Sequence, residues 1–263
     1  MSIPLNQKIT TKDLEKILTF ISNSLKQKGF QKVIFGLSGG IDSAVVALLC
    51  QKILKENILA ICMPSKNSNL SNFLDAKHLC EEFNIPYEIH SIAPYEEIFM
   101  QENPDALRLG NFYARIRMTL LYDLSQKYNA IVIGTSNKSE LMLGYGTIFG
   151  DLACALNPIA PFFKTQIFQI AKLLNIPSNI IQKAPSADLY PNQSDEAELG
   201  YSYALIDPLL EYITNTYPSL ELLPTDSLDN FTQQGFDLKM TQAIITRIKK
   251  NLFKSQAPLL FEV

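Results

Sequence analysis

The chain has 263 residues, of which 47% are hydrophobic, and its net charge is −3. This length suits one large α/β domain with a sizeable core. No strongly basic run occurs among its 23 basic and 26 acidic residues, so an extended nucleic-acid surface is not expected. No apolar run reaches the length of a membrane span, and the N-terminal residues lack the apolar segment of a signal peptide.

The cysteines and histidines predict no metal centre. The four cysteines form no CxxC pair, and neither histidine has a cysteine or carboxylate at ligand spacing. A zinc site is therefore not expected. Reduced cysteines in apolar segments are typical of a cytoplasmic protein.

Strands and helices alternate in the first half of the chain. Apolar residues at helical spacing predict a first helix over residues 14–25, with Thr10 or Thr11 as its N-cap. Further helical patterns lie at 73–83 and, longest of all, at 107–128. Short apolar runs predict four strands, at 33–37, 58–63, 87–92 and 130–134.

This alternation predicts an α/β fold with a doubly wound, Rossmann-like parallel sheet flanked by helices. Ligands of such sheets bind beyond the carboxyl ends of the strands, at the switch point. The first and fourth strands both run into polar motifs, so we expect them to be neighbours there. A short fifth strand near residues 153–156 is a further option.

The second half of the chain is expected to be mostly helical. Residues 176–200 are rich in Pro, Ser and Asp, and a loop of this length is uncommon unless it is functional. We therefore expect a single domain over 1–263, with a mobile loop at about 177–200 that closes over substrate and a helical C-terminal part at about 201–263. The predicted helices are 164–174, 203–213, 227–234 and 238–253.

The motif GLSGGIDS, residues 36–43, stands between the first strand and a helix. The first N–H groups of a helix lack partners and attract anions, and glycines let the backbone approach a phosphate. Ser38 and Ser43 add hydroxyl donors, and either Asp42 or Ser43 could cap the helix. An aspartate beside an anion implies a bridging Mg²⁺. No Lys follows the glycines, which excludes a Walker A loop.

An ordinary glycine turn is the plainer alternative, but SGGIDS between a strand and a helix favours a phosphate site. The motif resembles the pyrophosphate-binding loop of the N-type ATP pyrophosphatases. These enzymes split ATP into AMP and pyrophosphate while they adenylate a substrate.

A second polar motif, GTSNKSELMLGYGTIFGD, follows the fourth strand at residues 134–151. Thr135 lies at the strand's carboxyl end, and Glu140 falls in the first turn of an expected helix. The helix dipole would explain Glu140 by itself. Opposite Asp42, however, it would complete an oxygen-rich Mg²⁺ site.

From about residue 10 to its C-terminus, the chain resembles the ammonia-dependent NAD synthetases. The resemblance rests on GLSGGIDS, ARIR, GTSNKSE, FGD, FKT and PSADL, in this order. It implies an adenine nucleotide alpha-hydrolase-like fold and a cytoplasmic, homodimeric ligase. The implied reaction converts nicotinic acid adenine dinucleotide (deamido-NAD), ATP and ammonia into NAD, AMP and pyrophosphate. It passes through an acyl adenylate and is the last step of NAD biosynthesis.

The resemblance also implies roles for individual residues. Asp42 and Glu140 would hold Mg²⁺, and Asp151 and Lys164 would take part in catalysis, with Asp151 positioning ammonia or accepting a proton from ammonium. Arg115, Asp151 and Lys254 would contact deamido-NAD. The implied ATP-binding residues are Gly36, Leu37, Ser38, Gly39, Gly40, Ile41, Asp42, Ser43, Thr135, Lys164 and Ser186.

For the basic residues the plainer alternative is a solvated charge, at a helix start for Lys164, on a basic helix face for Arg115 and near the chain end for Lys254. In the implied dimer the long helix lies in the interface, with the dinucleotide between subunits. Its contact residues would be Phe112, Ile116, Leu120 and Leu124.

Three positions depart from the pattern of relatives. Ile148 and Ala155 stand where many relatives carry Lys and Asp, and Phe253 stands where some have His. The first two positions are associated with holding the dinucleotide. The resemblance therefore supports the ATP half of the site more than the substrate half.

Other functions stay open as alternatives. A tRNA-modifying adenylating enzyme of the same superfamily would usually show a basic face or a catalytic cysteine pair, and the sequence has neither. A glutamine-dependent relative carries an additional glutaminase domain, for which the chain is too short, so free ammonia is the expected nitrogen source. A non-catalytic nucleotide-binding module would need no paired Mg²⁺ carboxylates.

Overall fold

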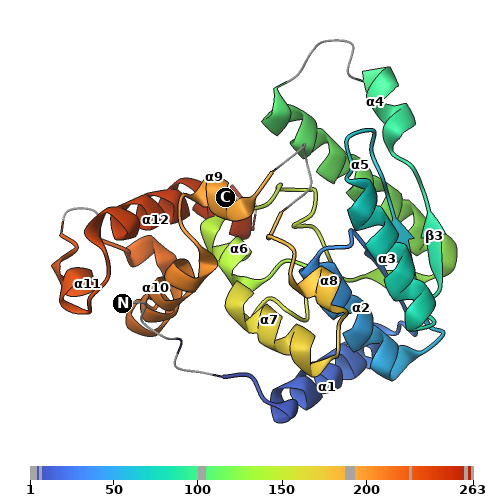
Figure 1. Ribbon diagram of the computed structural model, residues 1–263, viewed down its shortest axis with the longest axis horizontal. Helices are drawn as coiled ribbons and strands as arrows, with labels where there is room; N and C mark the ends of the chain where they lie inside the picture. Colours follow the sequence, from blue (N-terminus) through green and yellow to red (C-terminus); the bar gives the residue numbers. More distant parts are fainter. Residues whose placement is uncertain are drawn as a thin grey trace.

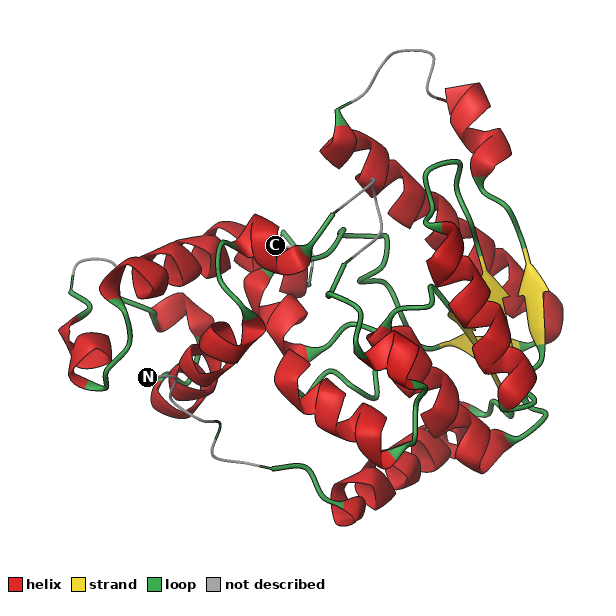
Figure 2. Cartoon of the chain, viewed as in Figure 1, coloured by secondary structure: helices red, strands yellow, loops and turns green. Residues whose placement is uncertain are grey.

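Four parallel strands form the centre of the molecule, in the order β3-β2-β1-β4. The computed structural model describes residue 5 and residues 8–99, 105–186, 193–224, 227–257 and 260–261. Within these ranges no helix combines the length and the apolar character that crossing a bilayer requires. The strands, yellow in Figure 2, are β1 (Lys32–Gly36), β2 (Ile58–Cys62), β3 (Tyr87–Ile89) and β4 (Ala130–Val132).

The register confirms that the first and fourth strands are neighbours. Val33 of β1 lies opposite Ile58 of β2 on one side and Ile131 of β4 on the other. The fifth strand considered for residues 153–156 is reduced to a single parallel bridge between Ile133 and Leu156. Each strand ends before its predicted carboxyl end, because the chain turns there into the loops that carry the polar motifs.

Helices cover both faces of this sheet (Figure 1). In chain order they are α1 (Thr11–Lys28), α2 (Ile41–Leu54), α3 (Leu70–Glu82), α4 (Ala93–Phe99), α5 (Ala106–Tyr128), α6 (Lys138–Leu143), α7 (Lys164–Leu173), α8 (Ser178–Ile181), α9 (Asp195–Leu199), α10 (Tyr203–Thr216), α11 (Asp229–Gln233) and α12 (Leu238–Asn251). Two 3₁₀ turns follow α10 and α12, at Leu220–Leu222 and Leu252–Ser255.

Alternation along the strands divides the core into two layers. Val33 and Phe35 of β1 point to the layer formed by α1, α2, α3 and α7. Ile34, between them, packs with Tyr113 and Met118 of α5 on the opposite face. Side chains of a strand alternate between faces, so the continuous apolar run of β1 is explained by burial on both sides.

The C-terminal helices α10, α11 and α12 lie together to one side of the sheet (Figure 1), and their apolar side chains form a separate cluster. Ile206 and Leu210 of α10 pack in this cluster with Ile244 and Ile248 of α12 and with Leu143 of α6. The cluster adjoins α6 and α7. The first residues of these two helices belong to the motifs GTSNKSE and FKT. The helical part expected at 201–263 is therefore present, while its assignment to a single domain stays a prediction.

Two local predictions are corrected. The N-cap of α2 is Gly40, with no side-chain cap, whereas Asp42 and Ser43 lie inside the first turn. Asp42 therefore does not cap α2, and its carboxylate accepts a hydrogen bond from Asn137 at the start of α6. The long loop predicted at 177–200 contains two short helices, α8 and α9. Residues 187–192 lie outside the described residues, and the mobility of this segment stays a prediction.

Candidate active site

A cavity of about 870 Å³ opens beyond the carboxyl ends of β1 and β4. This volume is typical of small-molecule sites, and the position is that expected for a parallel sheet. The predicted site residues that line it are Gly36, Leu37, Ser38, Gly40, Asp42, Ser43, Thr135, Glu140, Asp151, Lys164, Ser186 and Lys254.

The loop between β1 and α2 is held in shape by its own serines. The Ser43 hydroxyl donates to the Gly40 carbonyl over 3.0 Å and lies 3.1 Å from the Ser38 hydroxyl, which accepts from the Gly40 N–H over 3.2 Å. The first N–H groups of a helix have no intrahelical acceptor, and Gly40, the N-cap of α2, provides no side-chain acceptor for them. The loop therefore presents preorganised donors to an anion.

Gly39 is required by its surroundings. Its φ is +82°, and a Cβ there would lie 2.0 Å from the Asn72 carbonyl oxygen at the start of α3. Gly39 and the buried Ile41 are outside the described lining of the cavity, so these two residues shape the loop from behind.

Asp42 and Glu140 lie close together in the cavity wall, one on each side of Lys164 Nζ, and their role as metal ligands stays a prediction. Asn137 joins them, since its side-chain amide donates to Asp42 Oδ1 over 2.8 Å and its backbone N–H donates to Glu140 Oε2 over 3.2 Å. Asn137 is also the N-cap of α6, and Glu140 completes the capping box three residues later. A local capping motif thus fixes one carboxylate of the pair.

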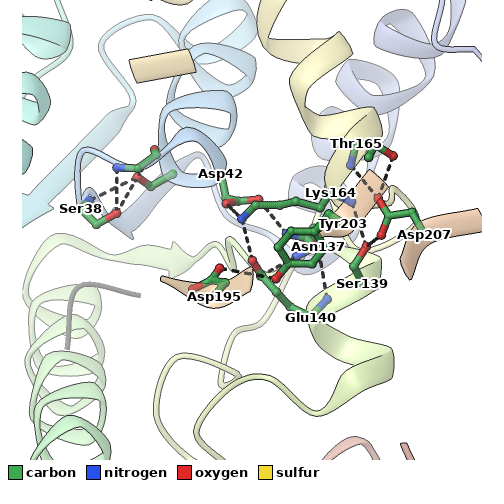
Figure 3. A network of polar contacts seen from close by, with 12 residues as sticks. Ser38, Asp42, Asn137, Ser139, Glu140, Lys164, Thr165, Asp195, Tyr203 and Asp207 are labelled. Atoms are coloured by element: carbon green, nitrogen blue, oxygen red, sulfur yellow. Dashed lines mark hydrogen bonds and ion pairs between the residues drawn. The ribbon is translucent and has the colours of Figure 1, made fainter. Parts of the chain in front are cut away.

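The Lys164 ammonium lies between the two remaining oxygens (Figure 3). Its Nζ is 2.6 Å from Asp42 Oδ2 and 2.9 Å from Glu140 Oε1. Burial works to lower the pKa of Lys164, but the nearby carboxylates outweigh burial and raise it. Burial raises the pKa of Glu140, against the opposing effect of the Lys164 charge. The three groups form one cluster, in which two carboxylates compensate the buried charge of the lysine.

A third carboxylate, Asp195 of α9, lies beside this cluster. Its side chain is 2% exposed, and its Oδ1 has no hydrogen-bond partner among the described residues. Its Oδ2 accepts from the Tyr203 hydroxyl over 3.5 Å, and the ring of Tyr203 lies below Lys164 Nζ, with its centroid 5.5 Å away. Burial raises the pKa of Asp195.

A buried aspartate of α10 locks the two helix starts together. Asp207 accepts from the Ser139 hydroxyl over 2.6 Å, from the Thr165 N–H over 2.8 Å and from the Thr165 hydroxyl over 2.7 Å. The Ser139 hydroxyl also accepts from the Lys164 N–H over 2.9 Å. The residues next to Glu140 and Lys164 therefore share one anchor, which is fully buried in the helical cluster.

The other end of the cavity has a different character. Lys254 donates to the carbonyls of Gly144 and Gly146, over 2.9 and 3.0 Å. Burial, together with the charge of Arg247, lowers the pKa of Lys254. Burial raises the pKa of Asp151, whose Oδ1 accepts from the Thr147 N–H over 2.7 Å.

Comparisons with known proteins agree over nearly the whole chain. Residues 13–258 match the family model described as NAD synthase. The chain belongs to the NAD synthase family. It is 51% identical to an NH(3)-dependent NAD(+) synthetase of Helicobacter pylori (strain ATCC 700392 / 26695), covering 94% of this chain and 96% of that one. It is 48% identical to the same kind of synthetase from Campylobacter jejuni subsp. jejuni serotype O:23/36 (strain 81-176), covering 98% and 99%.

Solved structures give the same family. An NH3-dependent NAD synthetase from Campylobacter jejuni subsp. jejuni NCTC 11168, in complex with the nitrate ion, superposes with a TM-score of 0.80 and 41% identity, over 96% of this chain and 99% of that one. An NMN synthetase from Francisella tularensis superposes with a TM-score of 0.84 and 33% identity, over 96% and 98%. The architecture is thus the Rossmann-like adenine nucleotide alpha-hydrolase fold of NAD synthases.

The two arginines of the motif ARIR both lie on the long helix α5 but have different surroundings. Arg117 lines the cavity and donates through Nε to the Met63 carbonyl over 3.1 Å. Arg115, the predicted dinucleotide contact, is exposed and lies outside the described lining of the cavity. The structure therefore does not bring Arg115 to the other predicted site residues of the chain, and its role stays a prediction.

The apolar residues proposed for a dimer interface pack against the core on the α5 side of the sheet. Leu124 is buried there, and Phe112, Ile116 and Leu120 are half-buried against the same cluster. The larger exposed apolar side chains of α5 are Leu107 and Tyr122. The homodimer stays a prediction of family resemblance.

Lys183 attaches the segment at about 177–200 to the rest of this NAD synthase, and the closure of this segment stays a prediction. Lys183 pairs with Asp75, donates to Asn72 Oδ1 over 2.7 Å and reaches the Gly39 carbonyl over 3.5 Å. The Asp195 N–H donates to the Pro185 carbonyl over 2.9 Å. Ser186, which follows, lines the cavity, as the PSADL motif of the family led us to expect.

Sequence reasoning missed the residues that hold the predicted ones. Asn137 carries a detectable signal, because Asn three residues before Glu is a capping-box pattern. Asp195 lies in the QSDE segment that follows PSADL, but nothing local indicates its burial. For Asp207 and Tyr203 the sequence gives no signal, because their contacts form only when α10 packs on α6 and α7.

Proposed function

We propose that the protein makes NAD from deamido-NAD, ATP and ammonia, releasing AMP and pyrophosphate. One observation carries the proposal. In a chain about half identical to NH(3)-dependent NAD(+) synthetases, Lys164 and Glu140 meet Asp42 at the end of the loop of residues 36–43. This set of groups suits a reaction in which pyrophosphate leaves.

The first step is activation of the substrate. A carboxylate oxygen of deamido-NAD attacks the α-phosphorus of ATP, the bond between the α-phosphorus and the bridging oxygen breaks, and pyrophosphate leaves. The N–H groups at the start of α2, with Ser38 and Ser43, would stabilise the charge that develops on the leaving group. Lys164 would add its positive charge at the same phosphates.

Magnesium fits the pair of carboxylates. Asp42 and Glu140 offer hard oxygen donors on opposite sides of one gap, and bound Mg²⁺ would supply Lewis-acid stabilisation of phosphate charge. No group of three or more His, Cys, Asp and Glu able to hold a metal occurs in the described ranges. The two carboxylates would therefore leave coordination positions for phosphate oxygens and water.

The second step forms the amide. The nitrogen of ammonia attacks the acyl carbon of the adenylate, the bond to the AMP oxygen breaks, and the nitrogen loses a proton. Asp151 is suited to accept that proton or to hold ammonium, because its buried carboxyl has a raised pKa. Lys254, Arg115 and Asp151 would contact the dinucleotide. We further propose that the enzyme is a cytoplasmic homodimer.

A single assay tests this function. The purified chain is incubated with deamido-NAD, Mg-ATP and ammonium, and NAD and AMP are expected in equal amounts. Glutamine in place of ammonium should give no more NAD than a reaction without nitrogen. AMP formation without NAD, or NAD formation supported equally by glutamine, would contradict the proposal.

A matched substrate separates the nearest alternative. Because an NMN synthetase superposes equally well, nicotinic acid mononucleotide is assayed beside deamido-NAD. We expect deamido-NAD to give the higher kcat/KM. A higher value for the mononucleotide would assign the chain to NMN formation instead.

A further inference from the structure

The position of Lys164 has a consequence for metal binding. All four oxygens of the Asp42–Glu140 pair have partners in the structure. Asp42 Oδ1 and Glu140 Oε2 are engaged by Asn137, and the other two oxygens hold Lys164 Nζ between them. A cation shared by the two carboxylates needs the oxygens that face each other across the gap. The ammonium already lies in that gap (Figure 3).

We propose that Lys164 competes with the metal ion, and that in the nucleotide-free protein Asp195 receives the ammonium when the ion enters. Two positive charges cannot share so small a space at low cost, so one must leave as the other arrives. Until then Lys164 holds the two carboxylates together and offsets part of their charge. The inference rests on the proposed function only in taking Asp42 and Glu140 as metal ligands.

Asp195 is the acceptor that the structure offers. Only 2% of its surface is exposed, and its Oδ1 has no hydrogen-bond partner among the described residues. Buried carboxylate oxygens are rarely left unpaired. Lys164 and Asp195 share Tyr203 as a neighbour, through its ring and its hydroxyl respectively. A rotation of the lysine side chain across the ring would bring the ammonium toward the unpaired oxygen.

Two consequences follow. Metal binding by the nucleotide-free protein is weak, because it must displace a well-placed internal cation. Binding together with ATP is stronger, because phosphate oxygens become a second set of partners for both the ion and Lys164. Lys164 thereby links occupation of the metal position to arrival of the nucleotide.

The test measures metal binding directly, without turnover. Mn²⁺ prefers the same oxygen donors as Mg²⁺ and is visible by electron paramagnetic resonance. It is titrated into the nucleotide-free full chain as wild type, Lys164→Met and Lys164→Arg. We expect Lys164→Met to lower the Kd for Mn²⁺ by about tenfold or more, because the competing charge is gone. Lys164→Arg keeps a cation and should stay near wild type.

Two controls locate the effect. Lys66→Met removes a lysine that pairs with Glu97 at the surface and lies outside the described lining of the cavity, and it should leave the Kd unchanged. The double variant Lys164→Met/Asp42→Asn should lose the gain in affinity. An equal gain in Lys66→Met, or a gain that survives Asp42→Asn, would show an effect of overall charge or a different site and would overturn the proposal.

Folding of each variant is checked by circular dichroism and thermal melting. If Lys164→Met does not fold, Lys164→Gln replaces it, and Asp195→Asn gives a test that keeps the lysine. In a chain that keeps Lys164, Asp195→Asn should raise the Kd for Mn²⁺ several-fold. In a chain with Lys164→Met or Lys164→Gln, the same change should raise it much less. An unchanged Mn²⁺ Kd in a folded neutral variant refutes the competition, even where wild type makes NAD. A wild-type chain that makes no NAD refutes the proposed function, whatever the titration gives.

Discussion

Two lysines at the two ends of one cavity have opposite surroundings, and their pKa values shift in opposite directions. Lys164 lies between two carboxylates, which raise its pKa in spite of complete burial. Lys254 is held by two backbone carbonyls and lies near Arg247, and its pKa is lowered. The first ammonium pairs directly with two carboxylates, whereas the second is hydrogen-bonded to carbonyls, and the charge of Asp151 does not outweigh burial and Arg247 there.

This difference indicates different roles. A lysine neutralised by carboxylates is retained as a cation in the ligand-free enzyme and must exchange partners during the reaction. A lysine held by neutral carbonyls keeps an uncompensated positive charge, so it is ready for an anionic substrate. Each of the following predictions tests one side of the comparison.

The largest effect is expected at the carboxylate pair. Asp42→Asn and Glu140→Gln should each reduce pyrophosphate release by about 10³-fold, because phosphate charge loses its metal-assisted stabilisation. Glu97→Gln, at an exposed ion pair, is the matched control. Unchanged turnover in both site variants would instead favour a non-catalytic nucleotide-binding module.

The next effect concerns the anchor behind this end. Asp207→Ala leaves Ser139 and Thr165 without a buried acceptor and should lower the free energy of unfolding by about 3 kcal/mol. Asp207→Asn keeps one acceptor oxygen and should cost less. Urea unfolding measures stability, and kcat is followed separately. A large rise in the KM for deamido-NAD with stability unchanged would contradict the anchoring role.

The carbonyl end should respond in binding rather than in stability. Lys254→Met should raise the KM for deamido-NAD by about 10- to 100-fold, as expected for loss of a charged contact. The KM for ATP should stay within about twofold of wild type, since Lys254 lies at the opposite end of the cavity. Steady-state kinetics with each substrate varied in turn would reveal the split. A rise in the KM for ATP alone would contradict the assignment of Lys254 to deamido-NAD.

Ligands should protect the segment that joins the two ends. Limited proteolysis within 181–200 should slow several-fold when ATP and deamido-NAD are both present. Tyr145 donates to Glu198 of α9, and Lys183 holds the other side of the segment, so closure would tighten existing contacts. Cleavage at the same rate with and without ligands would count against closure.

The smallest effect is in the pH dependence of substrate binding. A lysine with a lowered pKa loses its proton at a lower pH than an ordinary lysine. Below that pKa Lys254 is charged and binds the anionic substrate, and above it the KM for deamido-NAD should rise. Lys254→Arg stays charged, so its profile should be flat over the same range. Identical profiles for the two proteins would remove Lys254 from the dinucleotide site.

Short-range patterns predicted much of the fold correctly. The apolar run of β1, the glycines after it and the helical pattern from Ala44 define a strand, a turn and a helix, because each depends on residues close in sequence. The capping pattern of Asn137 and Glu140 is equally local. The cap of α2 was assigned wrongly, since a glycine at the N-cap leaves no side-chain signal.

The sequence by itself thus determined the strands, the glycine loop of residues 36–43 and the pair of carboxylates, Asp42 in this loop and Glu140 in α6. Only the tertiary structure decided what stands between those carboxylates. Lys164 is 122 residues away from Asp42, and Asp207 lies in a helix whose apolar pattern says nothing of its buried aspartate. Backbone preferences act over a few residues, whereas a buried charge is fixed by whichever distant groups packing brings within reach.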